Sequence, residues 1–117
     1  MPSRKLSSIS ILFCLLLVAA CGINTVSRDE LSSVKPGNVL TYRYRESDNR
    51  EWFYADKITR VDGDTIYYNP TKKRSTKASD ANLKDFDTTQ ELSMKMEELL
   101  KFATEQGDDK KKVIWIE

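Results

Sequence analysis

Histidine is absent from the 117 residues of this sequence, and its absence removes several classes of enzyme site. Histidine is the commonest general base and the commonest metal ligand, so Ser-His and Cys-His nucleophile pairs are excluded. Glycine is scarce as well, with four residues and no glycine-rich phosphate loop. The carboxylates, lysines and tyrosines that remain form no recognisable catalytic pair. We therefore expect a protein that is not an enzyme and that uses no metal and no other cofactor.

Neither sign of charge dominates, because 19 Lys and Arg residues stand against 18 Asp and Glu residues. A dedicated nucleic-acid binder carries a strong basic excess, so no nucleic-acid partner is expected. Cysteine is also rare. Cys14 and Cys21 both lie near the N-terminus, so the sequence after them has no thiol and no disulfide. A domain built from the rest must fold on its apolar core alone.

Residues 1–20 have the pattern of a secretory signal peptide. Arg4 and Lys5 make the start positive, residues 9–18 form an apolar run broken only by Ser10, and two alanines follow. This run is shorter than the roughly 20 residues that a membrane-spanning helix needs. We expect a leader that is cleaved rather than a permanent transmembrane anchor.

The end of this leader, Val18-Ala19-Ala20-Cys21, resembles the lipobox of bacterial lipoprotein precursors. The resemblance implies cleavage between Ala20 and Cys21, a diacylglycerol on the Cys21 sulfur and acylation of the new amino group. Several acyl chains anchor a protein stably, so the first expected partner is the cell membrane. Gly22 follows the cysteine where an aspartate could stand. By the same resemblance, this favours the outer membrane, facing the periplasm, in a cell with two membranes.

Residues 21–35 are predicted to be the lipidated N-terminus and a flexible tether. They are mostly polar, with apolar residues at no sustained period. A short helix over residues 28–34, with Ser27 as its N-cap, is the alternative. The folded domain is predicted to span residues 36–117.

Residues 39–45 alternate between apolar and polar side chains, which predicts a strand after the turn at Pro36-Gly37. In this strand Leu40, Tyr42 and Tyr44 should face a core. Their neighbours on the other face should meet solvent; these are Thr41, Arg43 and Arg45.

Two further strands are predicted over residues 52–61 and 65–69. Asp62-Gly63 between them is a hairpin signal, because glycine adopts the positive φ that such a turn needs. This turn also explains the two nearby aspartates without a metal. Asp56 and Lys57 interrupt the apolar pattern of the second strand, which predicts a β-bulge there.

The C-terminal part is predicted to hold one helix and a last strand. Thr88 and Glu91 have capping-box spacing, and a helix from residue 89 to about 106 follows. One apolar stripe would pack it on the sheet. The stripe consists of Leu92, Met96, Leu99, Leu100 and Ala103. Residues 113–116 are predicted to form a closing strand. Between the third strand and the helix, residues 71–88 are polar, with Leu83 and Phe86 as buried anchors.

The fold class follows from this order of elements. We predict an α+β domain in which a small, bent antiparallel sheet is formed by a three-strand meander and the C-terminal strand. One amphipathic helix covers its open apolar face. The outline is similar to an SH3-like barrel, as an analogy of shape alone.

Candidate binding residues come from two groups. The first is aromatic: seven of the eleven aromatic residues lie in the three meander strands, more than one small core face requires. From this group we select Trp52, Tyr54 and Tyr67. The second is the basic segment, defined as Lys72, Lys73, Arg74 and Lys77, which has the charge to meet phosphates or anionic polymers.

The function that fits these features is a non-catalytic, membrane-anchored lipoprotein of the cell envelope. Its small domain would bind another envelope protein as an accessory or assembly subunit. Two alternatives stay open. One is binding of an envelope polymer or lipid, such as peptidoglycan or lipopolysaccharide, through the basic segment. The other is an inhibitor or immunity-type lipoprotein.

Overall fold

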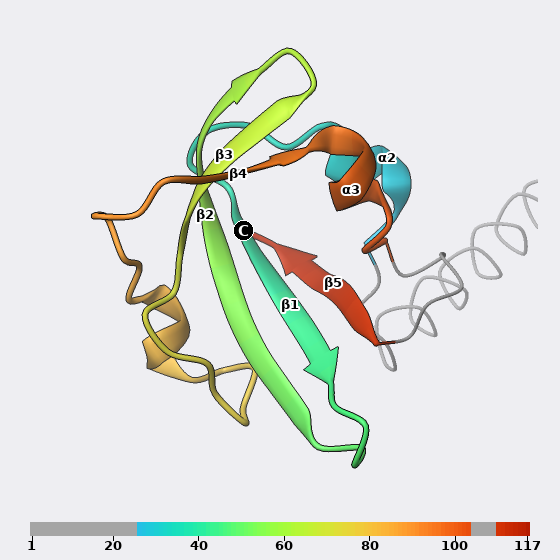
Figure 1. Ribbon diagram of the computed structural model, residues 1–117, viewed down its shortest axis with the longest axis vertical. Coiled ribbons are helices and arrows are strands. Elements are labelled where there is room, and N and C mark those ends of the chain that lie inside the picture. Colours follow the sequence, from blue (N-terminus) through green and yellow to red (C-terminus); the bar gives the residue numbers. More distant parts are fainter. Residues whose placement is uncertain (1–25, 104–109) are drawn as a thin grey trace, which may run out of the picture.

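The computed structural model describes residues 26–103 and 110–117, which form a five-stranded antiparallel sheet with two short α-helices (Figure 1). The strands lie in the order β4-β3-β2-β1-β5. The α+β class, the meander and the added C-terminal strand are therefore confirmed. The SH3-like outline is not confirmed. The elements in chain order are α2 (Arg28–Ser32), β1 (Val39–Arg45), β2 (Glu51–Asp62), β3 (Thr65–Pro70), a 3-10 helix (Ala81–Lys84), β4 (Leu92–Lys95), α3 (Met96–Leu100) and β5 (Lys111–Ile116).

The meander forms where the sequence predicts it. The turn between β2 and β3 has Gly63 at φ 59°, a conformation that costs glycine nothing. The pairing of β2 with β3 shifts register between Ile58 and Arg60, so a bulge is present. It lies at Thr59 rather than at Asp56 and Lys57, which both stay in regular pairing.

The C-terminal strand pairs with β1 at one edge of the sheet, with Leu40 opposite Ile116 and Tyr44 opposite Lys111. On its other side, the Val113 amide donates to the carbonyl of Phe102 at 2.8 Å. The chain after α3 thus covers part of this outer edge. The predicted last strand is confirmed, and it begins two residues earlier than expected.

Of the helix predicted over residues 89–106, only residues 96–100 are helical in the described part of the chain, and the rest of the prediction there is wrong. Residues 92–95 form β4 on the edge of β3, with Leu92 opposite Tyr68 and Met94 opposite Ile66. The helix is limited to α3, five residues long, and residues 104–106 lie outside the described residues. The sheet edge overrides the local helical pattern, because pairing with β3 satisfies the backbone and places Met94 against the core.

The expected capping box does not form either, because its carboxylate is used elsewhere. Glu91 accepts a hydrogen bond from the Thr59 hydroxyl at 2.8 Å and pairs with Arg60 at 3.3 Å. The turn before β4 is instead stabilised by Asp87, which accepts from the Thr89 amide at 3.0 Å.

The domain begins before residue 36. Val26, Leu31 and Val34 are all buried, so residues 26–35 are part of the fold and not a tether. Helix α2 has Ser27 as its N-cap, as the alternative interpretation of this segment expected, and Ser27 and Glu30 form a capping box. Leu31 projects from this helix and has no exposed surface.

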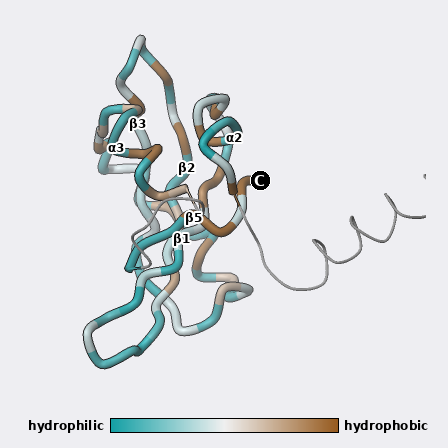
Figure 2. The backbone as a smooth tube through the Cα atoms, turned by 90° about the vertical axis from the view of Figure 1, so that its right-hand side faces the viewer, coloured by the Kyte–Doolittle hydropathy of each residue, from teal (hydrophilic) through white to brown (hydrophobic). Residues whose placement is uncertain are grey.

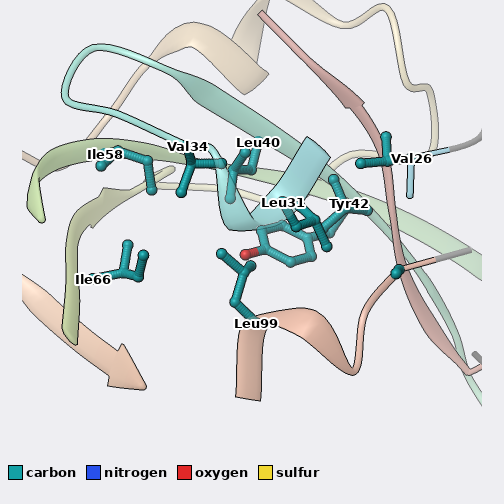
Figure 3. Close-up of a cluster of buried hydrophobic side chains, with 10 residues drawn as sticks. Val26, Leu31, Val34, Leu40, Tyr42, Ile58, Ile66 and Leu99 are labelled. Atoms are coloured by element: carbon teal, nitrogen blue, oxygen red, sulfur yellow. The ribbon is translucent and has the colours of Figure 1, made fainter. Parts of the chain in front are cut away.

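The core fills the space between one face of the sheet and the two helices. In Figure 3, Leu31 of α2 and Leu99 of α3 lie on either side of the Tyr42 ring. Tyr42 itself is fully buried at the centre of β1. The whole cluster comprises Val26, Leu31, Val34, Leu40, Tyr42, Ile58, Ile66, Leu99, Ala103 and Val113.

The opposite face of the sheet is also partly covered, which corrects the prediction for Thr41. This residue was expected to face solvent, yet it is 3% exposed. The segment after β3 pairs with β2 through Phe53 and Ser75, and its 3-10 helix buries Leu83. Leu83 is therefore a buried anchor, as predicted, and Phe86 is half-buried.

Candidate functional site

The predicted site residues do not all come together in the structure. Cys21 and Ala20, the proposed lipidation and cleavage positions, lie outside the described residues. Trp52 and Arg74 come together at the end of the β1–β2 hairpin. Tyr54 belongs to the core face, and Tyr67 lies on the other face of the sheet.

The β1–β2 hairpin ends in a tight turn over residues 46–50. Asn49 adopts φ 65°, which asparagine tolerates better than most residues. Its amide donates to the Glu46 carbonyl at 2.9 Å, and the Arg50 amide donates to the Asp48 carboxylate at 3.0 Å. Figure 2 shows this end of the hairpin as a hydrophilic projection from the body of the domain.

Trp52 and Arg74 form a stacked pair on this hairpin. The Arg74 guanidinium carbon lies 3.7 Å from the centre of the Trp52 ring. Glu46 holds the guanidinium from the side at 3.0 Å. Tyr44 is the cross-strand partner of Trp52, which places two half-buried aromatic residues next to each other. A planar cation over an aromatic face is a stable, partly preformed contact surface.

A hollow of about 370 Å³ adjoins this pair. Glu46, which binds the Arg74 guanidinium, also lines the hollow. Lys110 lies on its rim and places its Nζ 5.7 Å from the Tyr44 ring. The Trp52 Nε1 atom is buried without a hydrogen-bond partner in the described chain. We name this surface the hairpin patch: Tyr44, Arg45, Glu46, Trp52, Arg74 and Lys110.

The rest of the basic segment is offset by nearby carboxylates. Lys72 pairs with Asp85 at 3.5 Å. Two hydrogen bonds, from the Asn82 amide and the Ser75 hydroxyl, lower the pKa of Asp80, and the charge of Lys77 adds to this effect. Lys73 is exposed. The four cations therefore do not act as one undivided positive surface.

Tyr54 and Tyr67 do not join the hairpin patch. The Tyr54 ring stacks on Tyr42, with ring centres 4.8 Å apart, and is part of the packing around the core. Tyr67 lies under Arg60, whose guanidinium carbon is 3.7 Å from the ring centre. Because the side chains of neighbouring β3 residues alternate and Ile66 faces the core, Tyr67 faces the opposite side.

A buried polar cluster on the core face was not predicted as a site. Asp56, only 4% exposed, lies among the tyrosines of three strands. Burial raises the pKa of Asp56 to about 7, although the Lys111 ammonium and the Tyr42 hydroxyl act in the opposite direction. Burial also raises the pKa values of Tyr42, Tyr54 and Tyr68, and the Asp56 charge adds to this effect.

Lys111 completes this cluster from β5. Its Nζ lies 4.3 Å from the centre of the Phe102 ring, 4.9 Å from Tyr42 and 5.2 Å from Tyr54. Burial lowers its pKa, against the charges of Asp56 and Glu98. Lys111 was not among the candidate site residues predicted from the sequence. The interruption of the β2 pattern at Asp56 was the available signal of a buried ionisable group.

A second cavity of about 260 Å³ lies on the other face of the sheet. The 3-10 helix forms one wall, and Trp115 of β5 contributes to the other. Asp80, at its rim, already accepts hydrogen bonds from the Ser75 hydroxyl and the Asn82 amide. Lys84 and Glu117, which also line this cavity, pair with each other at 3.9 Å.

Comparison with known proteins gives no relative: no family model, no curated protein and no solved structure matches this chain. In the described part of the chain, no three or more Asp, Glu, Cys or His side chains converge as metal ligands. None of the described helices is long and apolar enough to span a membrane.

Proposed function

We propose that this protein is a non-catalytic lipoprotein of the cell envelope, anchored by lipid on Cys21, whose domain binds another envelope protein through the hairpin patch. The observation that carries the proposal is the Arg74–Trp52 stack, held by Glu46. Tryptophan, tyrosine and arginine are the residue types that most often dominate the binding energy of protein interfaces. Here the three types lie side by side on one partly exposed surface.

The preformed geometry adds to this argument. An arginine that is already fixed over a ring loses less side-chain entropy on binding than a free one. The adjoining hollow of about 370 Å³ gives a partner side chain a place to enter. Its lining residues carry both signs of charge, with Arg45 and Lys110 near Glu46, and the surface that they present to the hollow is mostly apolar. Charged groups beside the apolar stems of long side chains suit a protein surface better than an acyl chain.

The alternative function, binding of an anionic polymer or lipid through the basic segment, has less support. Lys72 and Arg74 each have a carboxylate within 3.5 Å, which reduces their attraction for phosphates. No specific contact favours the inhibitor or immunity alternative. We therefore keep protein binding as the proposed function.

Site-specific photo-crosslinking in the native cell tests the proposal. A photoreactive residue replaces Ser47, which lines the hollow beside the hairpin patch, and in a control it replaces Thr88, which is exposed elsewhere. We expect a discrete adduct from position 47 and none of the same mass from position 88. Arg74→Ala should abolish the adduct, whereas Lys73→Ala, its exposed neighbour, should leave it intact. An adduct that survives Arg74→Ala would contradict the assignment of the patch.

The anchor is tested separately. Cys21→Ser should abolish incorporation of labelled fatty acid and leave uncleaved precursor in the membrane. A correctly cleaved, soluble Cys21→Ser product would show that the leader is an ordinary signal peptide.

A further inference from the structure

The chain is fixed in the fold almost immediately after the proposed lipid site. Val26 is 2% exposed and belongs to the same buried cluster as Ala103 and Val113. Directly after it, the Ser27 hydroxyl accepts from the Glu30 amide at 3.2 Å, and the Glu30 carboxylate accepts from the Ser27 amide at 3.3 Å. Only residues 22–25 separate Cys21 from this fixed point.

The reach of this linker is short compared with the domain. Consecutive residues extend at most about 3.6 Å each, so Val26 lies within about 18 Å of Cys21 in any conformation. A domain of roughly 80 to 90 residues has a radius of gyration of about 12 Å and a diameter of about 30 Å. The linker therefore cannot pass around the domain to its opposite side.

We infer that the domain is held against the bilayer surface with one fixed side, the side of Val26, α2 and β5, facing the lipid headgroups. The inference rests on the lipid anchor of the proposed function. The covalent linker sets this orientation through its short length. The exposed residues at the start of α2 carry both signs of charge, as Arg28, Asp29 and Glu30, so they add little electrostatic attraction to the headgroups. The orientation should therefore be insensitive to salt.

The far side is then turned toward the aqueous compartment. In Figure 1, α2 and β5 lie on the right of the domain, and the chain between β3 and β4 lies on the left. The basic segment belongs to this left-hand part. Lys72, Lys73 and Lys77 would face away from the membrane that anchors the protein, whereas Arg74 lies in the hairpin patch nearer to β5. This orientation disfavours contact of the three lysines with the headgroups of that membrane.

Fluorescence quenching on the full lipidated protein tests the inference. Because lipid occupies Cys21 and Cys14 leaves with the leader, an introduced cysteine is the single thiol. Arg28→Cys marks the membrane side, and Lys73→Cys marks the far side as a matched exposed cation. Each labelled protein is reconstituted into phosphatidylcholine–phosphatidylglycerol vesicles that carry a headgroup nitroxide quencher. Mass spectrometry first establishes the acyl groups on Cys21.

We expect several-fold stronger quenching at position 28 than at position 73, unchanged at high salt. A Gly/Ser insertion of about 20 residues after Thr25, with a mean span near 25 Å, should remove the difference. Equal quenching of the two labels in acylated protein without the insertion would overturn this inference and leave the proposed function standing. Absence of acyl groups on Cys21 would overturn the lipid anchor itself, and the orientation with it.

Discussion

Replacing the buried carboxyl of Asp56 by an amide should change how stability depends on pH. An aspartate in an unfolded chain titrates near a pKa of about 3.9. Burial raises the pKa of Asp56 to about 7 in the folded protein. Between these values the folded state holds a proton that the unfolded state has lost. The free energy of unfolding should therefore fall as the pH rises from about 4 to about 7, and then level off.

The size of the effect follows from the two pKa values. Their difference of about three units corresponds to about 4 kcal/mol in total. Part of this loss has already occurred at pH 5, so the expected decrease between about pH 5 and about pH 8 is about 2.5 kcal/mol. Asp56→Asn cannot ionise and should lack this decrease.

The assay is urea unfolding followed by far-ultraviolet circular dichroism, on protein without residues 1–21, at several pH values. The informative quantity is the difference in unfolding free energy between wild type and Asp56→Asn, because contributions of other groups cancel in it. Asp64→Asn is the control. Lys95 lowers the pKa of the exposed Asp64, so Asp64 titrates below this pH range and the variant should keep the wild-type slope. A wild-type minus Asp56→Asn difference that stays constant from pH 5 to pH 8 would refute the reasoning.

Three further predictions concern the fold. Leu99→Ala should lower the unfolding free energy by about 2–5 kcal/mol because Leu99 is fully buried, whereas Leu92→Ala on β4 should change it by less than about 0.5 kcal/mol. Similar losses from both leucines in urea unfolding would support the single long helix instead. Truncation after Lys112 removes most of β5, so the cooperative thermal transition in circular dichroism should disappear; an unchanged melting temperature would contradict the observed pairing. Replacing the four basic-segment residues by Gln should cost less than about 1 kcal/mol in the same melts, since their ion pairs are exposed, and a larger loss would make the segment structural. Those residues are Lys72, Lys73, Arg74 and Lys77.

The sequence pattern predicted the meander correctly because its signals are local. The alternation in residues 39–45 specifies a strand over those same residues, and the glycine of the Asp62-Gly63 turn specifies the turn in which it lies. The apolar run at residues 113–116 was likewise recognisable as a strand. In the candidate site, the sequence supplied Trp52 and Arg74 as separate candidates, one aromatic and one basic.

The sequence pattern did not predict contacts between segments that are distant along the chain. The helix predicted over residues 89–106 is shortened to α3 because residues 92–95 pair with the free edge of β3. No residue near position 92 indicates that edge. Val26 appeared to belong to a tether because its partners, Ala103 and Val113, are far along the chain. The Arg74–Trp52 stack exists only because the segment after β3 returns beside β2.

By itself, the sequence determined the α+β class, the meander strands and turns, and the lipobox resemblance at Cys21, since each is encoded in neighbouring residues. Tertiary structure alone decided where the domain begins, which candidate residues meet, and that Asp56 is buried beside Lys111. The physical reason is that burial, pKa and surface composition depend on which segments pack together. Packing joins residues that the chain separates by tens of positions.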